Sequence, residues 1–264
     1  MNAPDGPLHK ALERDLAALR LNRIAETYQE ILKTAARKGS SMLEVLALLV
    51  AEEAAALRER ALLRRIKKAK LPKRKTLEEY DFSFPKRIPK QAILRLFDCD
   101  FVERHECGVF IGPRGTGKTH LLVALGYRAC ELGISVRFTR VVDMLNDLVT
   151  AQMNGTLAKA LREYVRPALL LADEVGYIPI DKRGADLMFQ VVAARYEAGS
   201  IVLSTNRPFK QWGTIFDADT TLATAMIDRL MHHGDAYVIR GDSYRMKDKE
   251  QDDDDEAAGS LVPA

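Results

Sequence analysis

The sequence contains no run of about 18 apolar residues, the length that a helix needs to cross a lipid bilayer. Its N-terminal residues, MNAPDGPLHKALERDL, also lack the apolar core of a secretory signal peptide. Cysteine is scarce, with only Cys99, Cys107 and Cys130 and no CxxC spacing among them. An odd number of scattered cysteines argues against a disulfide framework and against a zinc ribbon. We therefore expect a protein of the reducing cytoplasm that does not associate with membranes.

Charge is unevenly distributed along the chain. The formal net charge is +3, but residues 246–264 contain seven acidic side chains and only two lysines. Residues 1–245 therefore carry a net charge of about +8. A basic body favours a polyanionic partner such as nucleic acid, although solubility alone would also explain a modest excess of charge.

The N-terminal region has helical periodicity from about Leu8 to Lys70, with apolar residues recurring at steps of three and four. A Gly-Ser-Ser break at residues 39–41 ends one helix, and Ser41 with Glu44 forms a capping box for the next. That helix ends in a basic run that continues beyond Pro72. The pattern predicts a helical N-terminal domain over residues 1–71 and a basic linker over residues 72–90.

Short β-rich runs then alternate with helical stretches. The expected strands are Gly108–Ile111, Ser135–Thr139, Ala168–Ala172, Ile201–Ser204 and Tyr237–Arg240. The expected helices are Thr119–Glu131, Val142–Tyr164, Gly184–Glu197 and Thr221–His233. This order predicts an α/β domain over residues 91–245, with a five-stranded parallel sheet and helices on both faces. The polar tail, residues 246–264, is expected to be disordered.

A phosphate-binding motif lies between the first expected strand and its helix. Residues 112–119, GPRGTGKT, match G-x-x-x-x-G-K-[ST] in full. Glycines let backbone N–H groups turn toward a phosphate, and the helix N-terminus adds partial positive charge. In this P-loop Lys118 would reach the β- and γ-phosphates, and the Thr119 hydroxyl would ligate Mg²⁺. We expect ATP and Mg²⁺ here, with nucleotide contacts from Gly112, Pro113, Arg114, Gly115, Thr116, Gly117, Lys118, Thr119 and His120.

Two later strands end in polar residues suited to hydrolysis. The run LLLA at residues 169–172 delivers Asp173 and Glu174 at a strand end, the edge of a parallel sheet where ligands bind. Asp173 fits the Mg²⁺ shell, and Glu174 fits activation of the attacking water. Asn206 follows the next core strand, where an amide could hold that water or the γ-phosphate. The competing interpretation of Asp173 and Glu174 is an acid pair that caps a helix after a core strand. For Asn206 it is an ordinary Ser-Thr-Asn turn.

These three motifs resemble Walker A, Walker B and sensor 1 of AAA+ ATPases. Longer stretches are more specific, notably DEVGY at residues 173–177, RYE at 195–197 and GDSYR at 241–245. Together they are similar to the IstB family, the ATPase helpers of bacterial insertion-sequence transposases, which are related to the DnaC helicase loader. The resemblance covers nearly the whole chain as far as Arg245.

The resemblance implies a site that is completed by a neighbouring subunit. Arg229 matches the family's arginine finger, a guanidinium that stabilises charge on the transferring phosphate. Arg183 and Arg207 are further candidates, and a surface salt bridge is the alternative role for Arg229. A C-terminal lid is expected to be absent or vestigial, because only the acidic tail follows Arg245. The family implies an ATP-dependent homo-oligomer, either a ring or a helical filament, on duplex DNA.

Several basic residues are candidates for DNA contact. The resemblance implies an additional helix before the Walker B strand, which makes Lys159 and Arg162 candidates for phosphate contact, with Arg183 as a third. A solvated surface is the alternative for each of them. The basic run at residues 58–75 could contact DNA, dock a transposase or be solvated. His232 and His233 could suggest a metal, but adjacent histidines rarely point the same way on a helix and no Cys or acid cluster completes a site, so we expect packing or surface roles.

Two functions share this ATPase core. The leading hypothesis is an ATP-driven regulator that assembles on duplex DNA without sequence preference and recruits or stimulates a DDE-type transposase. The alternative is a helicase loader, whose N-terminal helices would bind a replicative helicase and which would prefer single strands. A small-molecule kinase is a weaker interpretation, because no acceptor-binding or lid segment follows the P-loop.

Overall fold

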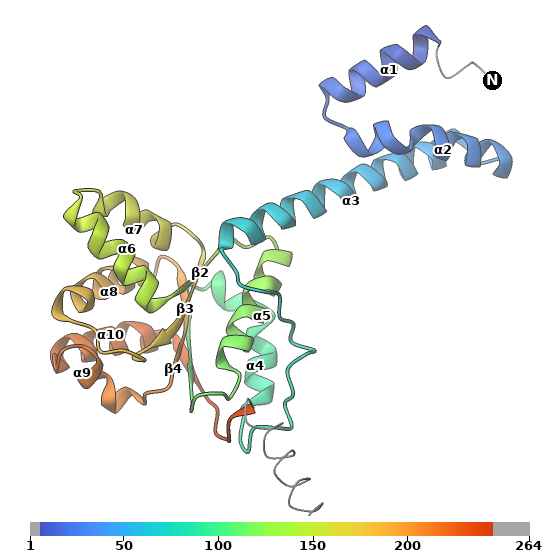
Figure 1. Ribbon diagram of the computed structural model, residues 1–264. Coiled ribbons are helices and arrows are strands. Elements are labelled where there is room, and N and C mark those ends of the chain that lie inside the picture. Colours follow the sequence, from blue (N-terminus) through green and yellow to red (C-terminus); the bar gives the residue numbers. More distant parts are fainter. Residues whose placement is uncertain (1–5, 245–264) are drawn as a thin grey trace, which may run out of the picture. The chain divides into compact units, whose positions relative to one another are not determined.

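The computed structural model describes residues 6–244, which fall into two compact units that divide between Arg64 and Arg65 (Figure 1). The first unit is entirely helical and contains α1 (Pro7–Ala18), α2 (Asn22–Lys38) and the greater part of α3 (Met42–Ala69). The second unit is an α/β domain that begins with the last turn of α3.

Helix ends in the first unit follow local sequence signals. The expected single helix before Gly39 is interrupted, because Arg20 adopts a left-handed conformation with φ 57° between α1 and α2. The capping box at the start of α3 is confirmed: the Ser41 N–H donates to the Glu44 carboxylate at 2.7 Å, and the Glu44 N–H donates to the Ser41 hydroxyl at 3.3 Å. The buried Glu53 carboxylate accepts from the Ile24 N–H at 3.0 Å, which ties α3 to α2.

The second unit is built on a five-stranded, wholly parallel sheet in the order β2-β3-β4-β1-β5. This arrangement confirms the predicted sheet. Its strands are β1 (Cys107–Ile111), β2 (Val136–Arg140), β3 (Leu169–Val175), β4 (Ser200–Thr205) and β5 (Gly234–Val238). The pairing of β3 with β4 shifts register between Ala172 and Val175, so Asp173 and Glu174 lie in an irregularity of the strand. Such a bulge re-aims side chains at the sheet edge.

Helices cover both faces of the sheet, as Figure 1 shows. On one face lies α5 (Lys118–Glu131), with α4 (Lys90–Leu96) beside it. The other face is covered by α6 (Val141–Met153), α7 (Leu157–Val165), α8 (Lys182–Arg195), α9 (Trp212–Ile215) and α10 (Thr220–His232). The core between these helices and the sheet is apolar and includes Trp212 and Phe216, both fully buried.

Two expected elements differ from the observed ones, and two short helices were not expected. The stretch expected as one helix, Val142–Tyr164, is two helices, because Gly155 turns the chain with φ +68° between α6 and α7. The last strand ends at Val238 and begins at Gly234, earlier than the expected Tyr237–Arg240. Helices α4 and α9 were not expected, since each is too short to show a clear periodicity.

The chain that follows β5 returns to the loop after β1. The Ile239 N–H donates to the Ile111 carbonyl at 2.8 Å, and the Tyr244 N–H donates to the Gly115 carbonyl at 3.0 Å. The expected polar tail, residues 246–264, lies outside the described residues. Within residues 6–244, no helix is both long enough and apolar enough to cross a membrane.

Candidate nucleotide site

The P-loop connects β1 to α5. Its glycines give it the tightly turned backbone that the motif predicts. Gly115 and Gly117 adopt φ +79° and +81°, a left-handed conformation that favours glycine. Lys118 begins α5, so the first N–H groups of that helix, which have no intrahelical acceptors, face the loop. The Lys118 ammonium donates to the Pro113 carbonyl at 2.6 Å and, although charged, is buried.

The two acids at the end of β3 lie beside the P-loop helix. The Thr119 hydroxyl donates to the Asp173 carboxylate at 3.1 Å, and Asp173 is 2% exposed. Ser204, at the end of β4, donates to the same carboxylate oxygen and accepts a hydrogen bond from the Glu174 N–H at 3.0 Å. Ser204 therefore holds both acids in place. The sequence did not reveal this role because Ser204 lies on β4 and the two acids lie on β3.

Glu174 has an unusual backbone. Its φ of 66° is a left-handed conformation that costs a residue with a Cβ roughly 1 kcal/mol or more. The register shift of β3 and the hydrogen bond to Ser204 hold it in this conformation. As a result, the Glu174 side chain lines the cavity above the P-loop.

Asn206 has a polar atom that the described residues leave unsatisfied. The Oδ1 atom of its amide is buried and has no hydrogen-bond partner within residues 6–244. Leaving such an atom without a partner costs about 1–3 kcal/mol. The neighbouring Thr205 hydroxyl, by contrast, has partners for both roles, because it donates to the Val175 carbonyl at 2.9 Å and accepts from the Arg207 N–H at 3.0 Å. A polar ligand or water at the end of β4 would satisfy the Asn206 amide.

A cavity of about 650 Å³ opens above the P-loop, large enough for a nucleotide. Its floor is formed by residues 114–120, and Glu174 and Tyr177 line another part. The segment expected to be a basic linker supplies a further wall. These additional lining residues are Pro72, Lys73, Lys75, Glu79, Tyr80, Asp81, Phe84 and Pro85, together with Tyr244 from the chain after β5.

Tyr80 is the anchor of that wall. Its hydroxyl donates to the Thr116 carbonyl at 2.9 Å, and its ring lies edge-to-face on His120, with 5.5 Å between centroids. His120 in turn lies 2.7 Å from the Thr76 carbonyl. Burial, with a smaller contribution from Asp81, raises the pKa of Tyr80 to about 12. Three aromatic residues within residues 80–84 are unusual for a solvated linker, and this signal could have pointed to a packed role.

Arg229 does not reach this cavity within one chain. It lies on α10, where its guanidinium donates to the Ala225 carbonyl at 3.0 Å and stacks over the Phe189 ring of α8 at 4.9 Å. The three candidate DNA-contacting residues are exposed: Lys159 and Arg162 on α7, and Arg183 in the first turn of α8. Helices α7 and α8 pack against each other, so the three cations lie on neighbouring elements.

Comparison with known proteins identifies the family. The model of the family described as IstB-like ATP binding protein matches residues 14–252. This chain belongs to the IstB-like family. An IstB-like relative, the ATP-binding protein of insertion sequence IS5376 from Geobacillus stearothermophilus, is 38% identical over 88% of this chain and 92% of its own length. The ATP-binding protein of IS21 from Pseudomonas aeruginosa is 37% identical over 90% of this chain and 89% of its own length.

Solved structures show the same fold for this IstB-like chain. AMPPCP-bound DnaA from Aquifex aeolicus superposes with a TM-score of 0.54 and 22% identity, covering 70% of this chain and 56% of that one. DnaI superposes with a TM-score of 0.55 and 17% identity, covering 63% of this chain and 91% of that one. The predicted α/β fold of a P-loop NTPase, with its five-stranded parallel sheet, is therefore confirmed.

The family-like RYE stretch has a structural role that the sequence did not indicate. Arg195 is 1% exposed, and its guanidinium makes five hydrogen bonds of 2.7–2.9 Å to backbone carbonyl oxygens. These carbonyls belong to Tyr164, Val165, Pro167, Ala168 and Ser200. Burial lowers the pKa of Arg195 to about 10. In this IstB-like protein Arg195 therefore joins the end of α7 to the starts of β3 and β4.

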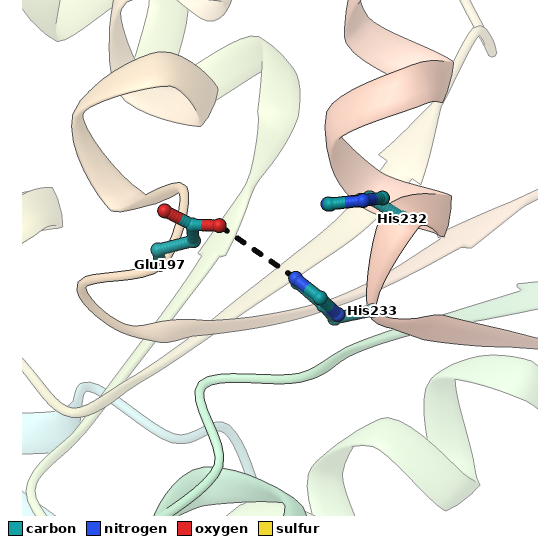
Figure 2. Close-up of side chains that lie close together, drawn as sticks. All are labelled: Glu197, His232 and His233. Atoms are coloured by element: carbon teal, nitrogen blue, oxygen red, sulfur yellow. Dashed lines mark ion pairs between the residues drawn. The ribbon is translucent and has the colours of Figure 1, made fainter.

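The structure places an acidic residue beside His232 and His233, which the sequence did not indicate. The loop after α8 brings Glu197 to both imidazoles, and Figure 2 shows the three side chains together. The sequence could not reveal this contact because β4, α9 and nearly all of α10 lie between Glu197 and the two histidines.

Proposed function

We propose that this chain is the ATPase helper of an insertion sequence: it hydrolyses ATP, assembles on duplex DNA as a homo-oligomer, and recruits or stimulates the DDE-type transposase. The observation that carries the proposal is the convergence of Thr119, Asp173 and Glu174 beside the P-loop. A site that only binds nucleotide has no need of an acid placed to accept a proton from water, and Glu174 lines the cavity beside the P-loop. Relatives that are ATP-binding proteins of insertion sequences support the biological setting.

The residues present fit a magnesium ion. Mg²⁺ prefers hard oxygen ligands, and the Thr119 hydroxyl and the Asp173 carboxylate, 3.1 Å apart, offer two of them. When bound with ATP, the ion would neutralise charge on the β- and γ-phosphates. Lys118 is the cation of the P-loop for those same phosphates.

Glu174 is the proposed general base. Its carboxylate would accept a proton from water while the water oxygen bonds to the γ-phosphorus and the bond to the ADP oxygen breaks. The Asn206 amide, whose buried oxygen has no other partner in the described part of the chain, would orient that water or the γ-phosphate. His120 is held by the Thr76 carbonyl at the wall of the same cavity.

Assembly would complete the site. Arg229 is held on α10 outside the cavity of its own chain, which supports its use as an arginine finger toward a neighbouring subunit. The exposed cations Lys159, Arg162 and Arg183 would contact DNA phosphates, so binding would be independent of sequence and sensitive to salt.

Retention on duplex DNA tests the proposal. We expect ATP to prolong the retention of the full-length protein at about 0.15 M salt. Glu174→Gln should bind ATP, lose hydrolysis by about 10²–10⁴-fold and stay on duplex DNA longer than wild type. Lys118→Ala, which removes the phosphate-binding cation, is the control and should show no effect of ATP. Shorter retention by Glu174→Gln would contradict the proposal, and a preference for single strands would favour the helicase-loader alternative.

A further inference from the structure

A second cluster of ligand-forming side chains lies on the α8–α10 side of the sheet. Glu197 follows α8, while His232 is the last residue of α10 and His233 is its C-cap. One ligand atom from each of these three residues lies within 4.8 Å of the other two (Figure 2). None of the three lines the nucleotide cavity.

The backbone explains how adjacent histidines come to share a site. Because α10 ends at His232, His233 adopts φ −127° and ψ 49° instead of continuing the helix. The two rings consequently lie with centroids only 4.1 Å apart and planes tilted by 47°. Glu197 adopts a left-handed φ of 56° in the loop opposite, and its carboxylate lies 3.6 Å from His233 Nε2.

This spacing is close to what a metal ion requires. With bonds of 2.0–2.2 Å, two ligand atoms of a tetrahedral zinc site lie about 3.3–3.5 Å apart. The 3.6 Å between Glu197 and His233 is nearly that distance. Side-chain exposures of 59% for Glu197 and 50% for His233 let both rotate inward and leave coordination positions open to water.

Tyr196 supplies the outer contact that ligating histidines usually have. Its hydroxyl lies 2.7 Å from His232 Nδ1, and the two rings stack with centroids 5.9 Å apart. Fixing one ring nitrogen in this way orients the imidazole and leaves Nε2 for a metal. By contrast, an exposed glutamate–histidine ion pair alone contributes little to stability.

We propose that Glu197, His232 and His233 form a binding site for one divalent transition-metal ion of the zinc, nickel or cobalt class. Two imidazoles and one carboxylate suit these ions, whereas Mg²⁺ and Ca²⁺ prefer oxygen ligands throughout. A bound ion links the loop after α8 to the end of α10. The stacking of Arg229 on Phe189 joins the same two helices. The site is independent of ATP hydrolysis and can be tested without nucleotide.

The test is a titration of the nucleotide-free, full-length protein, without any polyhistidine tag, with Co²⁺ followed by visible absorption and with Zn²⁺ followed by calorimetry. We expect one ion per chain. Glu197→Gln and His233→Ala should each weaken binding by about tenfold or more, and Tyr196→Phe by about tenfold through the lost outer contact. Zn²⁺ should raise the melting temperature of the wild type but not that of His233→Ala.

Two controls keep the result specific. His105→Ala removes an exposed histidine outside the cluster and should leave the affinity unchanged. The acidic residues at 252–255 remain in every variant, so binding by that tail would persist when the cluster is removed. The proposal is overturned if no 1:1 binding occurs, or if Glu197→Gln and His233→Ala bind as tightly as the wild type.

Discussion

The substitution Ser204→Ala should lower both the free energy of unfolding and the kcat of ATP hydrolysis. The Ser204 hydroxyl is buried and donates to the Asp173 carboxylate while accepting from the Glu174 N–H at 3.0 Å. Ser204→Ala removes both bonds but changes the volume little. A bond to a charged group contributes about 1.5–3 kcal/mol and one to a neutral group about 1 kcal/mol, so unfolding should become easier by about 2–4 kcal/mol.

Turnover should fall because Glu174 is no longer held in its left-handed conformation. A displacement of about 1 Å at a reacting group can cost about 10²-fold in rate, and we expect a loss of about that size in kcat. ATP affinity should change much less, because Lys118 and the P-loop backbone are not in contact with Ser204 in any described hydrogen bond.

The assay uses a single intrinsic probe. Trp212 is the only tryptophan of the chain and is fully buried in the α/β unit, so its fluorescence during urea unfolding reports on that unit alone. Steady-state phosphate release measures kcat. The matched control is Ser200→Ala, at the other end of β4, where a buried hydroxyl donates to the Phe101 carbonyl at 3.2 Å. This control should lose about 1 kcal/mol and keep its kcat.

The result that would refute this reasoning is a Ser204→Ala protein with the kcat of the wild type. A Ser204→Ala protein no less stable than Ser200→Ala would equally contradict the assigned hydrogen bonds.

Three further predictions concern other residues of the α/β unit. Arg229→Ala should keep ATP binding but lose about 10³-fold or more in hydrolysis by the DNA-bound assembly; unchanged turnover there would exclude it as the finger. Arg195→Met should lower the unfolding free energy by about 3 kcal/mol or more in urea melts, because five carbonyls lose a charged donor, and Arg195→Lys should not restore it. Stability should also depend on pH in the alkaline range, because burial raises the pKa of Tyr80, Tyr164 and Tyr237 from 10 to about 12. The folded state then prefers the neutral phenols, so this stability is present below pH 10 and should be lost as pH rises toward 12. A flat unfolding free energy over that range would contradict it.

The elements that carry the chemistry were predictable because their signals are local. The P-loop motif and the acids after an apolar strand are each contained within a few consecutive residues, and the alternation of strands and helices predicts a parallel sheet. Strand position was less certain where the apolar run was short, as for β5, whose edge position buries little of it. The helix break at Gly155 was missed, although the Asn154-Gly155 pair is a local turn signal that could have marked it.

The sequence by itself therefore determined that a phosphate loop and two acids meet at the edge of a sheet. Only the tertiary structure decided what surrounds them. Ser204 reaches Asp173 because β3 and β4 are neighbours, and Tyr80 reaches Thr116 because the segment before α4 folds back onto the P-loop. These contacts join residues far apart in the chain, and no local pattern records which distant backbone a side chain will meet. The fold, through strand order and helix packing, makes that choice.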